Sequence, residues 1–267
     1  MTSIIVPAHN EACRIGGNLT LLTLGAEPDE FEIIVVANGC SDDTVEVAKS
    51  IPGVRVIDLP GAGKAAALRA GDAAATRLTR IYLDADVPLS AHEARALAKA
   101  VTTLPGIHAA TGWRRIVTRG SSLAVRAFYA VNRRLPAYDD GLHGRGVIAV
   151  GPIGRARFEE FPDVIADDLF LDSLFTPEEK CQVNNVSASV IAPRTTVQLV
   201  RRLARVRRGN REMRGSHGAR PEARTAWLRY VVLPRPWLWP AGIFYAAVVV
   251  AAEIMSRRAG LAWGSRD

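Results

Sequence analysis

Short apolar runs alternate with longer amphipathic segments over the first hundred residues of the chain. The apolar runs are rich in Val and Ile and have the length of strands, and they cover residues 3–8, 31–38, 54–59 and 80–86. Between them, helical patterns cover residues 12–25, a segment that starts near Ser41 or Asp42, and residues 63–76. The run FEIIVVAN is apolar at most positions, which is typical of a parallel strand buried on both faces. This alternation predicts an α/β fold in which helices flank a mostly parallel sheet.

The rest of the chain continues this pattern less regularly. It predicts helices over residues 90–103 and 121–135, and a helix that starts near Ala166 or Asp167. It predicts strands over residues 107–116, 144–151 and 181–193. The chain has 267 residues and shows no internal repeat or low-complexity linker, which suits one large α/β domain or two small ones.

The positive charge of the chain is concentrated in one segment. The formal net charge is +7, and residues 201–224 alone hold nine Arg and two Glu, which accounts for all of it. Such a local excess indicates a phosphate-rich ligand or a membrane surface, and a solvated helix face is the simpler alternative. Three cysteines at wide spacing argue against a disulfide framework or a zinc cluster and fit a reducing cytosol. Because the N-terminus lacks the pattern of a signal peptide, we expect a cytoplasmic protein.

The C-terminal part contains sixteen successive residues without a charge, from Trp237 to Ala252. A spanning helix needs about 20 apolar residues. This run is shorter, contains Pro240 and is followed by Glu253. Arginines at both ends and nearby tryptophans suit a membrane interface, and contact with the inner face of the membrane is one expectation. A buried core helix or a contact between subunits of an oligomer explains the run equally well.

Two carboxylates end the predicted strand at residues 80–86. Asp84 and Asp86 are one residue apart, where like charges repel and burial is costly. A divalent cation such as Mg²⁺ or Mn²⁺ would neutralise that repulsion, with phosphate oxygens and water as its other ligands. The plainer explanation is a pair of loop aspartates that cap the following helix. Both residues fall at the carboxyl end of a strand, where parallel sheets bind their ligands.

Polar residues also follow the first two predicted strands. Asn10 and Glu11 come after the first strand and Asn38 comes after the second. Their side chains suit hydrogen bonds to a base or a ribose. Turn and cap chemistry explains Asn38 equally well, because it precedes a glycine and a helix start.

Lys64 follows a Gly-rich turn at the predicted start of a helix. A P-loop is excluded, because the positions that need Gly and Ser or Thr hold Asp58 and Ala65. What remains is a place where the amides and the dipole of a helix would help a lysine to bind phosphate. The alternative is a solvated lysine on the first turn of the helix.

Two further acids, Asp167 and Asp168, open an apolar helical segment. One of them could serve only as the helix cap. The sharper hypothesis is a general base directed at a hydroxyl group.

These stretches, taken in order, resemble the family 2 glycosyltransferases, which are inverting enzymes with the GT-A fold. The resemblance covers roughly residues 1–180 and rests on IIVPAHNE, IIVVANGCSDDT, GKAAALRAG, YLDAD and DVIADDLFL. It implies a GT-A sheet in a catalytic domain of residues 1–195. Residues 1–105 would bind the nucleotide and residues 106–195 the acceptor. Residues 196–267 would add an Arg-rich segment and an apolar helix.

The resemblance also implies roles for individual residues. The nucleoside of a UDP- or GDP-sugar would be surrounded by five of them, namely Pro7, Ala8, Asn10, Glu11 and Asn38. Lys64 would lie near the base or the diphosphate, and Asp84 near the ribose. Asp86 would hold the Mg²⁺ or Mn²⁺ ion. Asp168 would be the catalytic base.

The chain departs from the family pattern in three places. Asn38 replaces the usual Asp, Asp167 replaces the usual Glu before the catalytic Asp, and the QxxRW motif is absent as such. The Asp167 replacement leaves open which of the two acids is the base. Arginines of residues 201–214 could close over the diphosphate, and Arg205 and Arg208 are our candidates.

Inverting transfer of a sugar from a nucleotide-sugar needs a base that takes the proton of the acceptor hydroxyl. It also needs positive charge that stabilises the departing diphosphate. The expected partners are a nucleotide-sugar donor and an unidentified hydroxyl acceptor, which could be a glycan, a lipid or a small molecule. No nucleic-acid partner is expected. The competing hypotheses are a sugar nucleotidyltransferase and a non-catalytic nucleotide-binding or membrane-associated scaffold. The nucleotidyltransferase is disfavoured because VPAHNEACRIGG lacks the Gly-rich stretch with Arg that such proteins carry after their first strand.

Overall fold

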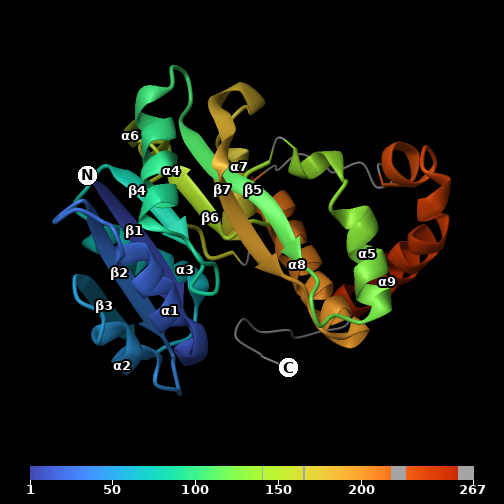
Figure 1. Cartoon of the computed structure of the whole chain (residues 1–267), viewed down its shortest axis with the longest axis horizontal. Coiled ribbons are helices and arrows are strands. Elements are labelled where there is room, and N and C mark those ends of the chain that lie inside the picture. The colour runs from blue at the N-terminus through green and yellow to red at the C-terminus, as the bar shows by residue number, and fades with distance from the viewer. Residues whose placement is uncertain (140, 165, 218–226, 258–267) are drawn as a thin grey trace.

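Seven strands form one sheet in the computed structural model, which describes residues 1–139, 141–164, 166–217 and 227–257 (Figure 1). The strands are β1 (Thr2–Ala8), β2 (Phe31–Asn38), β3 (Val54–Leu59), β4 (Thr79–Leu83), β5 (Ala109–Val117), β6 (Val147–Val150) and β7 (Lys180–Ile191). Their order in the sheet is β3-β2-β1-β4-β6-β5-β7. Only β6 among them is antiparallel to its neighbours, β4 and β5. The predicted α/β fold with a mostly parallel sheet is thus confirmed.

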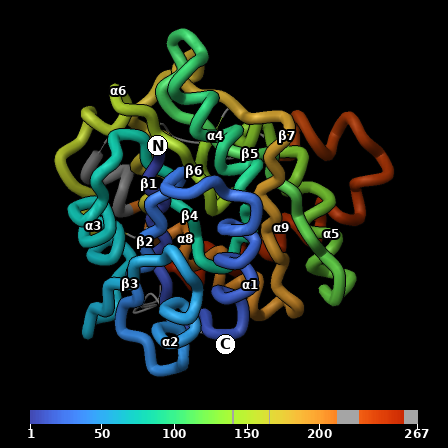
Figure 2. The backbone as a smooth tube through the Cα atoms, turned by 60° about the vertical axis from the view of Figure 1, so that its left-hand side comes forward, coloured from blue at the N-terminus to red at the C-terminus, as the bar shows by residue number. Residues whose placement is uncertain are grey.

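Helices cover both faces of this sheet, and Figure 2 shows α1 and α3 on opposite sides of β1 and β2. One face packs against α1 (Ala12–Thr23), α2 (Thr44–Lys49) and α4 (Ala91–Thr103), and the other against α3 (Lys64–Ala74) and α7 (Asp167–Ser173). Side chains of β1 alternate between the two faces of the sheet, since Ile4 packs with Leu19 of α1 and Ile5 packs with Leu68 of α3. A strand buried on both faces is mostly apolar, as β1 is from Ile4 to Ala8.

The strand predicted to reach residue 86 ends at Leu83, so Asp84 and Asp86 lie in the turn after β4. The Asp84 amide donates a hydrogen bond of 2.8 Å to the Gly146 carbonyl, just before β6. Helix α4 takes its cap from Ser90, whose side chain accepts from the Glu93 amide in a capping box. Because Ser90 caps α4, helix capping does not explain the Asp84 and Asp86 pair.

The chain between β5 and β7 supplies the other wall of the site. Its elements are α5 (Leu123–Asn132), η1 (Pro136–Tyr138), α6 (Pro152–Arg155) and η2 (Pro177–Glu179), in addition to β6 and α7. Because β6 is antiparallel to β4 with Leu83 opposite Val147, the loop before β6 meets the turn after β4. This pairing brings residues more than sixty positions apart into one site.

The C-terminal part consists of α8 (Thr196–His217), η3 (Trp227–Val232), η4 (Pro236–Leu238) and α9 (Trp239–Arg257). Pro240 falls in the first turn of α9, where the missing amide hydrogen has no intrahelical partner to lose. Side chains of α8, η3 and α9 share a buried cluster with α5, in which Tyr245 stacks on Phe128 at 4.8 Å. The helical C-terminal extension is confirmed, and residues 218–224 of the Arg-rich segment lie outside the described residues.

Candidate functional site

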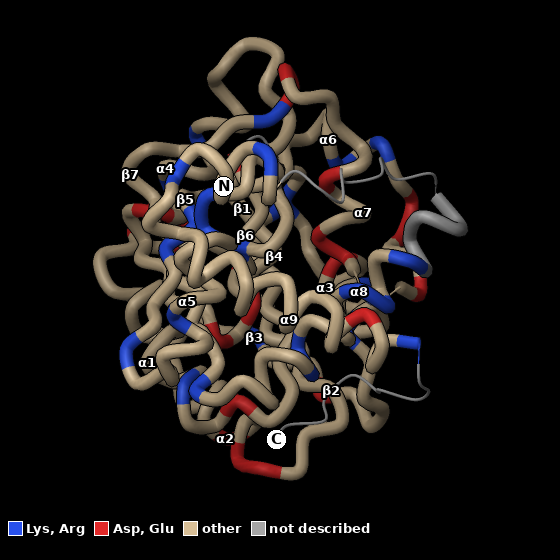
Figure 3. Tube along the Cα trace, turned by 90° about the vertical axis from the view of Figure 1, so that its right-hand side faces the viewer, with Lys and Arg blue, Asp and Glu red and all other residues tan. Residues whose placement is uncertain are grey.

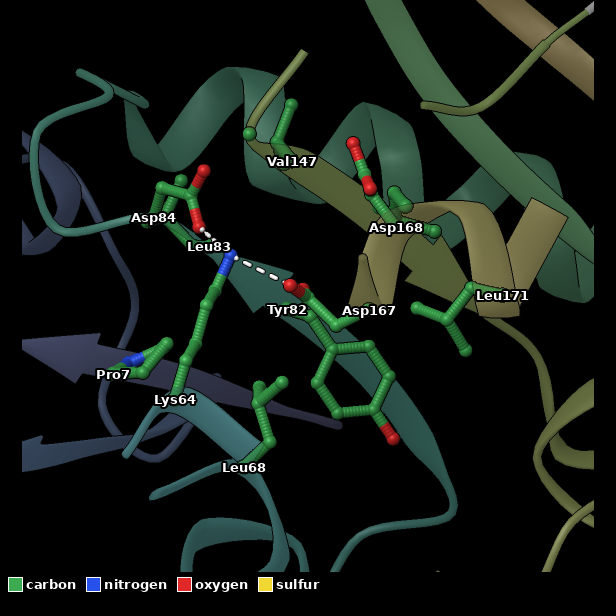
Figure 4. Close-up of a pocket in the computed structure, with 12 residues that line it drawn as sticks. Pro7, Lys64, Leu68, Tyr82, Leu83, Asp84, Val147, Asp167, Asp168 and Leu171 are labelled. Carbon is green, nitrogen blue, oxygen red and sulfur yellow. Dashed lines mark ion pairs between the residues drawn. The ribbon is translucent and has the colours of Figure 1, made fainter. Parts of the chain in front are cut away.

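Five of the predicted site residues line one pocket at the carboxyl ends of β1 and β4 (Figure 4). Pro7 and Asp84 come from these strand ends, Lys64 from the start of α3, and Asp167 and Asp168 from the start of α7. The pocket encloses about 310 Å³, including space open to solvent. Its floor is apolar and is formed by Leu68, Tyr82, Leu83, Val147, Ile148 and Leu171. Charged groups on an apolar floor interact more strongly than they do in water.

Lys64 joins the two acidic sides of this pocket. Its Nζ atom lies 2.7 Å from Asp84 Oδ1 and 3.0 Å from Asp167 Oδ1, and Figure 4 shows it between the two carboxylates. Burial by itself lowers the pKa of Lys64, but the charges of Asp167 and Asp84 outweigh it and raise that pKa above its ordinary value. Lys64 is therefore a fixed cation and not a solvated lysine.

Asp167 has an unusual environment for a carboxyl group. Its side chain is 14% exposed, and burial raises its pKa to about 6 even though Lys64 lowers it. The neighbouring charges of Asp168 and Asp84 act in the same direction as burial. Asp167 therefore retains its negative charge at neutral pH because Lys64 is beside it.

Asp168 points away from Lys64 (Figure 4). Its Oδ2 accepts a hydrogen bond of 2.8 Å from the Gly144 amide, and its Oδ1 accepts one of 2.8 Å from the Leu169 amide. The two acids thus divide between different surroundings: Asp167 faces Lys64, and Asp168 faces the loop of residues 141–146. That loop precedes β6 and borders the pocket, which Gly146 lines.

Asp172, one helical turn after Asp168, holds the same loop. Its Oδ1 accepts hydrogen bonds from the Leu142 amide at 2.7 Å and from Lys180 Nζ at 2.8 Å. Burial alone would raise the pKa of Asp172, but the nearby His143, whose Nδ1 lies 3.7 Å from Oδ2, and hydrogen bonds from Lys180 and the Leu142 amide outweigh it and lower the pKa to about 2. Carboxylates of α7 thus fix the loop at two amides, those of Leu142 and Gly144.

A buried arginine completes this loop. Arg145 is 1% exposed and donates to the carbonyls of Gly141 and Tyr138, and burial lowers its pKa to about 10. Arg114 packs over the Tyr138 ring at 3.8 Å and donates to the Gly144 carbonyl at 3.2 Å. The burial of Arg145 makes it a support of the loop of residues 141–146.

Asp86 lies beside the pocket on its solvent side. Its side chain is 47% exposed, and its Oδ2 lies 3.9 Å from the Arg14 guanidinium. Partial burial and the negative charges of Asp84 and Glu11 raise the pKa of Asp86, while Arg202 and Arg14 lower it. A cation at this carboxylate would relieve that repulsion.

The described residues contain no group of three or more His, Cys, Asp or Glu side chains arranged to hold a metal ion. A divalent ion at Asp86 would therefore take most of its oxygen ligands from a bound diphosphate and water. Mg²⁺ and Mn²⁺ bind in this way at phosphate-transfer sites, so the oxygen donor at Asp86 fits such an ion.

The loops after β1 and β2 are tied together by their asparagines. Asn38 is fully buried, donates to the Ala8 carbonyl at 2.8 Å and accepts from the Gly63 amide at 3.1 Å. Ala8 is 1% exposed. Both side chains are enclosed by protein, and the expected place of these two residues around a nucleoside stays a prediction. Asn38 fixes the turn that presents Lys64.

Asn10 and Glu11 remain closer to the surface at the start of α1. Asn10 has a left-handed backbone (φ 53°), and its Oδ1 accepts from the Ser41 amide at 2.8 Å. The Glu11 amide donates to the Thr44 hydroxyl at 2.8 Å, and the Glu11 carboxylate lies 3.8 Å from Arg14. Both residues border the rim that Asp86 and Arg14 form.

Arg205 and Arg208 lie partly buried on α8, which packs against α7. Another arginine of that helix, Arg202, exerts its charge on Asp86 and donates to the Ile191 carbonyl at 3.0 Å. The Arg-rich segment therefore does approach the acidic turn after β4. Sequence reasoning pointed to the segment but missed Arg202 within it.

Arg14 was also missed, although its spacing from Glu11 places the two side chains on adjacent turns of one helix.

Nothing in the sequence indicates that Gly146 belongs to the site, because its position beside Asp84 depends on strand pairing. It has a left-handed backbone (φ 72°), and an added Cβ would lie 2.9 Å from Asp84 Oδ2 and 2.6 Å from a Val87 methyl group. A side chain at position 146 would therefore displace Asp84.

Replacing Asp172 by Ala should lower the free energy of unfolding by about 2 kcal/mol at neutral pH, because two hydrogen bonds to a charged group disappear. The folded-state pKa of about 2 lies below the ordinary 3.8, so this stability exists above about pH 4 and is lost as the pH falls. Urea unfolding at several pH values measures the difference. Asp139→Ala, which removes an exposed carboxylate from the same region, is the control. Equal losses in both variants would contradict the role given to Asp172.

A mostly parallel sheet, with Asp84 just after β4 and the acid pair at the start of α7 beside it, is typical of a glycosyltransferase of the GT-A fold. The chain belongs to glycosyl transferase family 2, whose family model matches residues 3–133. The expectation drawn from the sequence motifs is thereby confirmed.

Solved structures with the same fold include two enzymes. Mannosyltransferase PcManGT from Pyrobaculum calidifontis, in complex with GDP-Man and Mn²⁺, has a TM-score of 0.60 and 22% identity over 96% of this chain and 78% of its own. Glucosyl-3-phosphoglycerate synthase from Mycobacterium tuberculosis, in complex with Mn²⁺, UDP and glucosyl-3-phosphoglycerate, has a TM-score of 0.60 and 21% identity, covering 83% of this chain and 81% of its own. No curated protein matches the chain by sequence.

Proposed function

We propose that this glycosyltransferase moves a sugar from a UDP- or GDP-sugar to an acceptor hydroxyl with inversion at the anomeric carbon. One observation carries the proposal: Lys64 links Asp84, at the end of β4, to Asp167, which directly precedes Asp168. The donor side and the acid pair therefore share a single pocket. The bound GDP-Man and UDP in the two similar structures support this choice of donor class.

Asp168 is the proposed base. It takes the proton of the acceptor hydroxyl, whose oxygen attacks the anomeric carbon while the bond from that carbon to the diphosphate oxygen breaks. The electron pair of the broken bond stays on the nucleoside diphosphate. Because Asp168 faces the loop of residues 141–146, the acceptor would enter between α7 and that loop.

Positive charge is needed where the diphosphate departs. Asp86 would hold a Mg²⁺ or Mn²⁺ ion, which supplies Lewis-acid stabilisation to that leaving group when bound. Arg205 and Arg208 are proposed to contact the diphosphate from α8, and the charge of Arg202 near Asp86 supports this approach. Asn10 and Glu11 are proposed contacts of the nucleoside at the rim.

The donor class can be tested directly with purified protein. Thermal unfolding with a panel of nucleotide sugars and Mn²⁺ should show a UDP- or GDP-sugar that raises Tm by about 5 °C at saturation. The absence of a shift with every nucleotide sugar would exclude the proposed donor class. Release of pyrophosphate from a nucleoside triphosphate and a sugar phosphate would identify a sugar nucleotidyltransferase instead. Donor binding without turnover across a broad acceptor panel would favour the scaffold.

Replacing Asp86 by Ala should weaken donor binding at least about tenfold in the presence of Mn²⁺, because the ion would lose its protein ligand. Binding measured without a metal should change little. Asp43→Ala removes an exposed carboxylate that makes no side-chain cap hydrogen bond, and it serves as the matched control. Calorimetric titration with and without Mn²⁺ separates the two effects. If Mn²⁺ still strengthens donor binding in Asp86→Ala, the ion is held elsewhere.

The three cysteines are all free in the structure, which supports the proposed cytoplasmic location.

A further inference from the structure

Helix α9 exposes an apolar face to solvent. Its exposed positions recur every three or four residues, as one side of a helix does, and they are Trp239, Pro240, Ile243, Phe244, Ala247, Val250, Ala251 and Ile254. Ile243 is 73% exposed and Val250 is 56% exposed. A surface helix normally turns its polar side to water, so this helix has its apolar side in an unexpected place.

The apolar surface continues onto the segment before α9. Leu228, Tyr230, Leu233 and Trp237 are exposed there, and Trp237 is 71% exposed. Within the described residues, nine of the twenty exposed large hydrophobic side chains lie between Leu228 and Ile254. Single exposed hydrophobic residues need no explanation, but a contiguous apolar surface indicates a binding surface. We call the exposed side chains of residues 228–254 the α9 face.

The charges around the α9 face are almost entirely positive. Residues 227–257 contain Arg229, Arg235 and Arg257, and their one acid is Glu253. Glu253 is bound by Arg207 of α8 at 2.9 Å and by Arg257 at 3.0 Å. Figure 3 looks onto this end of the molecule, where α9 is free of charged residues along most of its length. No unpaired carboxylate of this segment would repel an anionic surface.

We propose that the α9 face docks on an anionic lipid bilayer. Its aliphatic and aromatic side chains would enter the boundary between headgroups and acyl chains, and its arginines would meet the lipid phosphates. Trp237 and Trp239 at the start of α9 suit the headgroup level, where tryptophan is enriched. This proposal does not rest on the proposed transfer reaction, because no residue of the α9 face lines the candidate pocket.

The helix would lie flat on the membrane and not cross it. Residues Pro236–Arg257 are long and apolar enough to span a bilayer, with a mean hydropathy of 1.7 over an 18-residue stretch. The inner side of α9, however, is fixed to the protein: Tyr245 stacks on Phe128 at 4.8 Å, and Arg211 donates to the Ser256 hydroxyl at 3.0 Å. A spanning orientation would break these contacts and carry Glu253 into hydrocarbon. Lying flat retains them and buries only the exposed side.

A second copy of the chain is the main alternative occupant. In a symmetric dimer the same patch meets itself, so Arg229 and Arg235 would approach their own copies or each other around the interface. Those like charges would repel, and the segment offers no acid besides Glu253 to pair with them. An anionic bilayer supplies the complementary charge on every side. Figure 1 also places α9 at the opposite end of the molecule from β3. A flat contact through α9 therefore leaves the β3 edge of the sheet exposed.

Sedimentation of the full chain with vesicles tests the proposal. The protein should bind vesicles of phosphatidylcholine with phosphatidylglycerol and bind pure phosphatidylcholine vesicles more weakly. Ile243→Glu should weaken binding to the mixed vesicles at least about tenfold, because it places a charge in the centre of the apolar contact. Ile153→Glu, at an isoleucine of α6 that is 63% exposed, should bind like the unmodified protein. Arg229→Gln should reduce the preference for the anionic vesicles.

Both isoleucines are on the surface, so both variants should fold. Thermal unfolding of each variant checks this. The proposal is overturned if the unmodified protein remains in the supernatant with the mixed vesicles. It is also overturned if Ile243→Glu and Ile153→Glu lose binding equally. Analytical ultracentrifugation that shows a dimer broken by Ile243→Glu, without vesicle binding, would assign the α9 face to self-association.

Discussion

Replacing Asp168 by Asn is expected to lower kcat by a factor of about 100 to 10,000, the range that a general base contributes. Asparagine has nearly the same shape and keeps a carbonyl oxygen that can accept from the Gly144 amide. The loop of residues 141–146 should therefore stay in place, and the affinity for the donor should not change. Only the capacity to take a proton from the acceptor hydroxyl is removed. Steady-state kinetics and calorimetric donor titration measure the two quantities.

Asp167→Asn is the informative partner of this variant. It removes a carboxylate that lies 3.0 Å from Lys64, so it should disturb the ion pairs and weaken the donor side of the pocket. A variant that keeps donor affinity but loses turnover identifies the base. If Asp167→Asn behaves in this way and Asp168→Asn retains turnover, the roles of the two acids are exchanged. Nuclear magnetic resonance of the first product, before its anomers equilibrate, determines inversion or retention in the unmodified enzyme.

The sequence predicted the first half of the fold well because each strand there is a short apolar run. Strands buried on both faces are mostly apolar, so FEIIVVAN and RIYL stand out from the amphipathic helices around them. Parallel strands also put their carboxyl ends at one edge. The convergence of Pro7 and Asp84 in one pocket follows from that rule together with the helix start at Lys64.

Direction and pairing of later strands were harder to predict. Residues 144–151 were expected to contain a strand, but nothing in their composition showed that β6 would be antiparallel to β4. The contact between Gly146 and Asp84, and the Asp168 hydrogen bond to Gly144, both depend on that pairing. Local patterns do not encode contacts between residues so far apart in the chain. The part of the site formed by the loop of residues 141–146 was therefore visible only in the structure.

Polar residues near strand ends were the other difficulty. Asn38 and Asn10 have the same side chain, and either could bind a ligand or hold a turn. The structure gives Asn38 two partners within the protein, the Ala8 carbonyl and the Gly63 amide. Burial decides such cases, and burial depends on how the flanking loops pack. The sequence could identify candidates but could not assign their contacts.

Lys64 differs from these residues because two sides of the pocket depend on it. Replacing Lys64 by Met keeps the length and the apolar stem of the side chain but leaves Asp84 and Asp167 without their cation. Breaking a buried ion pair from one side costs about 3 kcal/mol or more. Asp84 is 37% exposed and keeps much of its hydration, so most of that cost should come from Asp167. The fixed positive charge between donor and acid pair is also lost, so kcat/KM should fall about 100-fold.

The loss of stability in Lys64→Met should depend on pH. The folded-state pKa of Asp167 is about 6, above the ordinary 3.8, so the cost of its ionisation to the folded state builds up between about pH 4 and pH 6 and is complete above that pH. Without Lys64 that pKa rises further, and protonation can remove the unpaired charge at low pH. The variant should therefore be close to the unmodified protein in stability at about pH 5 and about 3 kcal/mol less stable at about pH 8. Urea unfolding at both pH values measures this, with Lys99→Met at an exposed lysine of α4 as the control. A deficit that is the same at both pH values would mean that Asp167 does not depend on Lys64 for its charge.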